Sequence, residues 1–125
     1  MKKMIKGIGT DLVEIARIDQ ILKEQPRFVE RILTEQEKKY FSGLSPLRQT
    51  EFVAGRFAAK EALSKALQTG IGPHFSWKDV SILPSEGGAP QVIWHGRQER
   101  FSTHISITHT AEYALAYVVL EEKNS

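Results

Sequence analysis

The sequence predicts an α+β domain in which a mainly antiparallel sheet is wrapped around one long helix. Residues 46–69 form the longest segment with helical apolar spacing and are rich in alanine. Both ends of the chain instead carry short segments bounded by turn-forming residues. In these segments apolar and polar residues alternate, or all residues are apolar. The 125 residues contain no internal repeat, low-complexity tract or linker, so we expect a single domain over residues 1–125.

The first part of the chain predicts one strand followed by two helical pieces. The strand is expected over residues 4–15 and passes through Gly7 and Gly9, which mark a bulge or a close backbone approach. Residues 16–33 change to the helical period and are interrupted around Pro26. We therefore expect two short helices here.

Two further helices are predicted after them. Thr34 and Glu37 have the spacing of a capping box, which predicts a short helix that ends at Gly43. Pro46, preceded by a serine, fits the first position of the long helix, which is expected to extend to Thr69.

After residue 72 the pattern favours strands. Residues 80–83 and 91–94 flank a turn with two glycines, which predicts a hairpin. Polar and apolar residues alternate over residues 103–108. Over residues 113–120 both the odd and the even positions are apolar. We therefore expect the last strand to be covered on both faces.

Composition excludes several classes of protein. The chain has no cysteine, so it can form no disulfide, thiolate nucleophile or cysteine-ligated metal site. Its longest apolar run, residues 113–120, is far shorter than the roughly 20 residues that span a bilayer. Glycine, threonine and aspartate interrupt the start of the chain before a secretory signal could form. We expect a cytoplasmic protein with no membrane partner.

The net charge of +2 conceals an uneven distribution. Residues 1–70 hold 13 lysines and arginines against 9 aspartates and glutamates, a balance of +4, whereas residues 71–125 hold 4 against 6, a balance of −2. A basic first half is compatible with an acidic partner, with a phosphorylated ligand or with scattered surface charge.

Polar residues in two of the predicted strands are candidates for a site. Asp11 stands in an otherwise apolar strand. If its carboxylate is buried there, it needs a cation or hydrogen bonds to neutralise its charge. If the strand ends at this point, Asp11 is an ordinary turn residue. His104, Ser106 and Thr108 point to one side of a later strand, and His109 points to the other. These groups could donate to phosphate oxygens or simply face solvent. The chain has no HExxH, Walker or nucleophile-elbow motif.

A third group of candidates lies in the long helix. Arg56, Lys60 and Ser64 follow one another at spacings of four and share a face, and Glu61 and Lys65 form a second such pair beside them. A solvated face with an ordinary ion pair is one explanation. Nearby alanines, however, would let a ligand or another backbone approach this helix closely.

Together, the three groups resemble the small bacterial holo-[acyl-carrier-protein] synthases of the 4′-phosphopantetheinyl transferase superfamily. The resemblance rests on Gly7-Ile-Gly-Thr-Asp11, on Gly55-Arg-Phe-Ala-Ala-Lys-Glu-Ala62 with Lys65, and on Ser106-Ile-Thr-His-Thr110. It covers nearly the whole chain and implies the 4′-phosphopantetheinyl transferase fold over residues 1–125. One departure is Gln68, where the family often has glycine.

The resemblance implies transfer of the 4′-phosphopantetheine arm of coenzyme A (CoA) to a serine of apo acyl carrier protein, in the service of fatty acid biosynthesis. Asp11 and Glu61 would be the ligands of Mg²⁺, or of Mn²⁺ in its place, and Lys65 would join them as a catalytic residue. Mg²⁺ prefers hard oxygen ligands and is often shared between carboxylates and substrate phosphates. The serine proton could pass to a metal-bound water or to Glu61, and the residues leave this open.

The same resemblance implies a set of binding residues and a homotrimer with active sites between subunits, in which the apolar last strand would take part. Contacts with CoA are expected from Arg56, Lys60, Ser64, Lys65, Thr69, Gly70, Ser106, Thr108 and His109. Lys60 lies about 100° round the helix from Glu61, so it could serve structure or a neighbouring subunit instead. The acidic carrier would dock on Arg17, Lys23, Arg27 and Arg31.

Two other functions account for parts of this sequence. A small nucleic-acid-binding domain would explain the basic first half, but no basic stripe interleaved with aromatic residues is present, and the most cationic helix face carries Glu61. A CoA-binding protein without catalysis is disfavoured because both metal-ligand candidates are present. We therefore expect no nucleic-acid partner.

Overall fold

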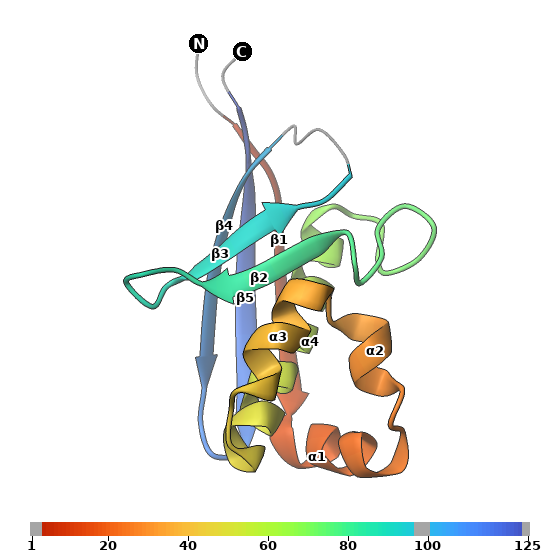
Figure 1. Ribbon diagram of the computed structural model, residues 1–125. Helices are drawn as coiled ribbons and strands as arrows, with labels where there is room; N and C mark the ends of the chain where they lie inside the picture. Colours follow the sequence, from red (N-terminus) through yellow and green to blue (C-terminus); the bar gives the residue numbers. More distant parts are fainter. Residues whose placement is uncertain (1–3, 97–100, 124–125) are drawn as a thin grey trace.

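The computed structural model describes residues 4–96 and 101–123, which form two antiparallel sheets and four helices (Figure 1). In chain order the elements are β1 (Ile5–Glu14), α1 (Ile15–Glu24), α2 (Phe28–Ile32), α3 (Glu35–Ser42), α4 (Pro46–Ala66), β2 (Val80–Pro84), β3 (Pro90–Trp94), β4 (Phe101–His109) and β5 (Tyr113–Glu122). None of the helices in this part of the chain is long and apolar enough to cross a membrane.

The long helix α4 lies against one face of a three-stranded sheet with the order β1-β5-β4. The β2–β3 hairpin and the shorter helices α1 to α3 contact other sides of α4 (Figure 1). This arrangement confirms the predicted α+β fold, with antiparallel strands around one long helix. It also confirms the break between α1 and α2, the hairpin, and the capping box at Thr34 and Glu37.

Two glycines let β1 lie directly against α4. A Cβ atom at Gly9 would overlap the carbonyl oxygen of Ala62, and one at Gly7 would overlap that of Ala66. Any side chain at these positions would force the strand away from the helix. The glycines therefore set the distance between β1 and α4, and they place the next inward residue of β1, Asp11, beside the helix.

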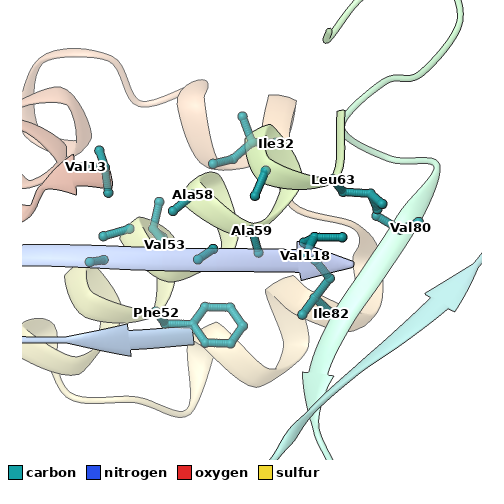
Figure 2. Close-up of a cluster of buried hydrophobic side chains, with 14 of the residues drawn as sticks. Val13, Ile32, Phe52, Val53, Ala58, Ala59, Leu63, Val80, Ile82 and Val118 are labelled. Atoms are coloured by element: carbon teal, nitrogen blue, oxygen red, sulfur yellow. The ribbon is translucent and has the colours of Figure 1, made fainter. Parts of the chain in front are cut away.

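The core fills the space between α4, the inner face of the sheet and β2 (Figure 2). Alternate residues of β5 point inward and are fully buried, which is the period-two pattern of a strand with one covered face. Small residues on the facing surface of α4, such as Ala58, Ala59 and Ala62, allow the helix to pack closely on this sheet.

The opposite face of the sheet is apolar and exposed in the single chain. Leu12 is 62% exposed, Leu115 39% and Tyr117 45%. The expectation that the last strand is covered on both faces therefore does not hold within one chain. We call this the outer sheet face; its described residues include Ile8, Leu12, Leu115, Tyr117 and Val119, and on β4 His104, Ser106 and Thr108.

Helix α4 ends at Ala66, three residues before the predicted end at Thr69. Gln68 takes a left-handed conformation with φ of 65°, and its N–H donates to the carbonyl of Lys65. The N–H of Gly70 then donates to the carbonyl of Ser64, which closes the helix. A left-handed residue after the last turn is a common helix ending, and glycine is its preferred occupant.

Replacing Gln68 by glycine is expected to stabilise the fold. The left-handed conformation strains any residue with a Cβ, so Gln68→Gly should add about 0.5–1 kcal/mol to the free energy of unfolding, or roughly 2–5 °C in Tm. Thermal denaturation followed by circular dichroism measures this change. Gln68→Ala keeps the Cβ and should give no such gain; a lower Tm for the glycine variant would contradict the explanation.

Candidate active site

Asp11 of β1 and Lys65 of α4 meet where the two glycines bring strand and helix together. The Asp11 side chain is 16% exposed, and its Oδ1 lies 3.2 Å from Nζ of Lys65. The same Nζ donates to the carbonyl of Thr10 at 2.9 Å. Lys65 therefore holds the Asp11 carboxylate and the adjacent backbone of β1 in place.

Glu61, one turn before Lys65, adds a second carboxylate to this group. Its pKa is raised, first because it is partly buried and second because the negative charge of Asp11 is close, while Lys65 opposes the shift. Asp11, Glu61 and Lys65 together carry one net negative charge when all are ionised. The protein thus holds two carboxylates near one another with only one cation beside them.

Such a site fits a hard divalent cation. Mg²⁺ is bound in many phosphate-handling proteins by one or two carboxylates together with substrate phosphates and water. Asp11 and Glu61 supply oxygen ligands of that type, and a bound cation would stabilise the charged Glu61 side chain against the burial and the repulsion by Asp11 that raise its pKa. Within the described residues no group of three or more potential ligands gathers, so two carboxylates are the donor set that these residues offer.

A cationic cavity of about 290 Å³ lies at the β4 edge of the sheet, and we call it the arginine cavity. Arg56 lies in its wall with Nε donating to the carbonyl of Ile82 at 2.8 Å and its guanidinium 4.2 Å from the centre of the Phe52 ring. Burial lowers the pKa of Arg56 to about 10, which still leaves it charged at neutral pH. The other lining residues include Tyr40, Leu44, Arg48, Glu51, Gly55, Pro84, Gly88, Pro90, Ile107, His109 and Ala114.

This cavity and the carboxylates lie at opposite edges of the sheet. Asp11 and Ile107 both pair with Ala116 of the central strand, so they are two strand spacings apart, or about 10 Å. Helix α4 crosses between them, with Gly55 near Ile107 and Ala62 against Gly9. Within one chain, the arginine cavity and the carboxylate pair therefore open on different sides of α4.

A second cavity, of about 370 Å³, connects Asp11 with the predicted docking residues. Arg17 and Arg31 line it together with Asp11, Phe28 and other side chains. Arg27 and Arg31 also line a neighbouring groove around Phe28. Lys23 lies apart from both linings and pairs with Asp19 at 3.0 Å.

The structure does not bring all predicted CoA contacts together. Lys60 and Ser64 are buried, with Lys60 bonded in the interior and Ser64 Oγ donating to the carbonyl of Glu61, so neither is placed for a ligand to reach. The burial contradicts the expected CoA contact of Ser64 and favours the structural alternative stated for Lys60, because the helix face they share points into the core. Thr69 and Gly70 follow α4 at the surface, and Ser106 and Thr108 lie on the outer sheet face.

Two residues of these sites were missed in the sequence. Arg48 stands two turns before Arg56 on α4, and the helical spacing could have revealed that both face one cavity. Glu37 was predicted only as a capping residue, although its side chain is fully buried against Lys60. No local sequence pattern could have shown that Glu37 and Lys60, which are far apart in the chain, contact each other.

Comparisons with known proteins agree with this geometry. The 4′-phosphopantetheinyl transferase superfamily matches residues 7–118, and this defines the class of the protein. A holo-[acyl-carrier-protein] synthase of Bacillus pumilus is 52% identical over 98% of this chain and all of its own. One of Geobacillus sp. is 49% identical over 94% of this chain and 98% of its own.

Solved structures agree as well. The holo-(acyl-carrier-protein) synthase of Bacillus anthracis, solved in complex with CoA (3′,5′-ADP), has a TM-score of 0.89 and 48% identity, covering 96% of this chain and 99% of that one. The Helicobacter pylori enzyme in complex with coenzyme A has a TM-score of 0.77 and 36% identity, covering 90% and 98%. The chain belongs to the holo-[acyl-carrier-protein] synthase family of phosphopantetheinyl transferases.

Proposed function

We propose that this protein transfers the 4′-phosphopantetheine group of CoA to a serine of apo acyl carrier protein, and that fatty acid biosynthesis uses the product. The observation that carries the proposal is the Asp11–Glu61 carboxylate pair, which is held beside Lys65 by a strand and a helix in close contact. The relatives that share this chain's fold and half its sequence are named for the same transfer.

Each residue of the carboxylate site has a part in that transfer. Asp11 and Glu61 would hold Mg²⁺, or Mn²⁺ in its place, and the bound ion would neutralise charge on the CoA pyrophosphate. Lys65 orients Asp11 and adds positive charge next to the phosphates. The acceptor serine oxygen forms a bond to the β-phosphorus as the bond to the bridging oxygen breaks, which releases adenosine 3′,5′-bisphosphate, and the serine proton passes to Glu61 or to a water molecule.

The nucleotide end of CoA would bind in the arginine cavity, where Arg48 and Arg56 carry charge opposite to that of its phosphates, and this favours a site shared between subunits. The cavity and the carboxylates lie on different sides of α4, and the backbones of Ile107 and Asp11, one beside each, are about 10 Å apart across the sheet. One CoA molecule can reach both kinds of site most simply when the cavity of one subunit adjoins the carboxylates of the next. The exposed apolar outer sheet face supports the proposed homotrimer, because it offers a surface for that contact.

Acyl carrier protein would dock on the basic residues beside Asp11. The cavity that contains Asp11 also contains Arg17 and Arg31, so a carrier bound there would present its serine to the carboxylate site. Arg27 extends the same positive surface along α2. Lys23 would contribute only at the margin, because it is paired with Asp19.

Reversing the charge of Arg17 is expected to weaken carrier binding selectively. Arg17→Glu should raise the KM for apo carrier roughly five- to tenfold and leave the KM for CoA unchanged, because surface charges at a docking face act mainly on encounter. Initial rates over a range of carrier concentrations measure this. Lys39→Glu, on the exposed surface of α3, makes the same charge change elsewhere and should keep the parent KM. An unchanged KM in Arg17→Glu would remove it from the docking face.

A mass measurement tests the proposed function directly. Purified protein, CoA, Mg²⁺ and apo acyl carrier protein should yield a carrier heavier by one phosphopantetheine group. A chelator should abolish the gain and added Mg²⁺ should restore it. No mass gain with folded protein would reject the transfer, and a gain that survives the chelator would reject the metal requirement.

A further inference from the structure

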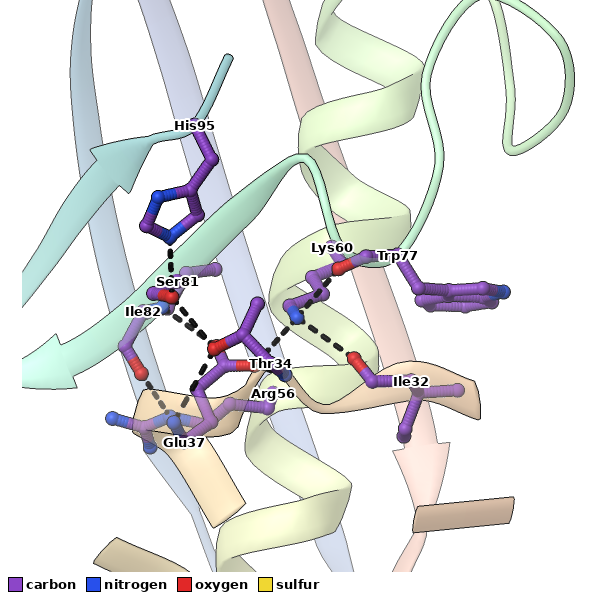
Figure 3. Close-up of polar contacts among 9 residues, drawn as sticks. All are labelled: Ile32, Thr34, Glu37, Arg56, Lys60, Trp77, Ser81, Ile82 and His95. Carbon is purple, nitrogen blue, oxygen red and sulfur yellow. Dashed lines mark hydrogen bonds and ion pairs between the residues drawn. The ribbon is translucent and has the colours of Figure 1, made fainter. Parts of the chain in front are cut away.

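A fully buried ion pair involves Lys60, the neighbour of Glu61 on α4. Lys60 and Glu37 are both 0% exposed, and Lys60 Nζ lies 2.6 Å from Glu37 Oε1. The same Nζ donates to the carbonyls of Ile32 at 2.8 Å and Trp77 at 2.7 Å. All three donors of the ammonium group are therefore used inside the protein, as Figure 3 shows.

The Glu37 carboxylate extends this network to other elements. Its Oε1 accepts from the backbone N–H of Thr34 at 2.9 Å, and its Oε2 accepts from that of Ile82 at 2.6 Å. Through Lys60 and Glu37, α4 is joined to the end of α2, the start of α3, the segment before β2 and β2 itself. Arg56, one turn earlier on α4, also bonds Ile82 (Figure 3).

These bonds restrain the rotation of α4 about its own axis. Contacts with Gly7 and Gly9 determine how near α4 lies to β1, but apolar contacts are not directional. Hydrogen bonds from Arg56 and Lys60 are directional and fix two successive turns of the same helix. A buried charge pair is costly to form, so its presence is better explained by the geometry that it imposes than by added stability.

Rotation of α4 decides where the Glu61 carboxylate lies. Glu61 follows Lys60 and projects about 100° round the helix from it, toward Asp11. A side-chain end lies about 5–6 Å from a helix axis, so a rotation of about 10° moves it by about 1 Å. Displacements of that size can cost about a hundredfold in rate when reacting groups must be aligned.

We propose that Lys60 and Glu37 are positioning residues that fix the rotation of α4 and thereby hold Glu61 beside Asp11. They touch neither substrate nor the reacting atoms. This inference rests on the proposed function, since it explains how the two proposed metal ligands, Asp11 and Glu61, are kept close to each other.

The test replaces the ion pair as a unit. Lys60→Met alone would leave a buried, unpaired carboxylate and could fail to fold. The double variant Lys60→Met/Glu37→Gln removes both charges, and glutamine can still accept a backbone N–H. Val53→Ala serves as the matched control, because it removes buried α4 packing without touching the network.

Three quantities are measured on each folded variant: Tm, the affinity for Mn²⁺ by electron paramagnetic resonance with CoA present, and steady-state kinetics. We expect the double variant to bind Mn²⁺ at least tenfold more weakly and to lose kcat about a hundredfold. Val53→Ala should lower Tm but keep Mn²⁺ affinity within twofold.

Two results would overturn the proposal. Mn²⁺ affinity and kcat equal to those of the parent would show that the pair serves stability alone. A raised KM for the carrier with unchanged Mn²⁺ affinity would show that it orders α2 instead. An inactive parent that binds no Mn²⁺ would instead count against the proposed function, so the two failures are distinguishable.

Discussion

Glu61→Gln is expected to lower kcat for carrier modification by about a hundred- to a thousandfold, comparable to the loss of a group that stabilises transition-state charge. The substitution removes one of two carboxylates while preserving side-chain size. Initial rates at saturating CoA, carrier and Mg²⁺ measure the loss, and Asp11→Asn should give a similar one. Glu86→Gln, in the exposed turn between β2 and β3, should keep the parent kcat. A parent-like rate for Glu61→Gln would refute the metal assignment.

The same variant should fold at least as stably as the parent. The folded-state pKa of Glu61 is raised, so its charged form is disfavoured by folding. An acid with a raised folded pKa reduces stability progressively as the pH rises through its unfolded and then its folded pKa, and the reduction is complete above both. At neutral pH, Glu61→Gln removes this reduction, and its Tm in the absence of metal should equal or exceed that of the parent. A marked loss of Tm would mean that Glu61 is structural.

Local patterns predicted most of the fold because they depend on neighbouring residues. The capping box at Thr34, the break near Pro26 and the alternation through Ile105 and Ile107 in β4 are all found where the sequence places them. The end of α4 was predicted too late because Gln68 takes a conformation that glycine usually marks. Helical periodicity gives no sign of this conformation; the one hint in the sequence is that Gln68 stands where the family often has glycine.

The site was predicted unevenly for a related reason. Asp11 and Glu61 were identified from motifs, and the structure brings them together through glycine contacts that the motif itself contains. Lys60 was left between a CoA contact and a structural role because periodicity shows which residues share a helix face but not whether that face meets solvent or core; its full burial favours the structural role. Its partner Glu37 is distant in sequence, so only the tertiary fold reveals their contact.

The outer sheet face leads to the second large expected effect, on assembly. Leu115→Arg places a charge in the middle of this face, next to Leu12 on β1, where the single chain leaves room for it. We expect the variant to fold as a monomer and to lose about a hundredfold or more in activity, because the arginine cavity and the carboxylates no longer meet on one CoA molecule. Analytical ultracentrifugation and carrier modification measure the two effects. Leu47→Arg, at a 69% exposed position on α4, should change neither.

Mixed assemblies decide whether the site is shared. Glu61→Gln subunits keep the arginine cavity intact, and Arg48→Glu subunits, which alter only the cavity wall, keep the carboxylate pair. When the two inactive variants are refolded together, about one quarter of the interfaces in a random trimer combine an intact cavity with an intact carboxylate pair. Activity should therefore return to about a quarter of the parent value. A site contained within one chain would give no recovery, because every chain in the mixture carries a defect.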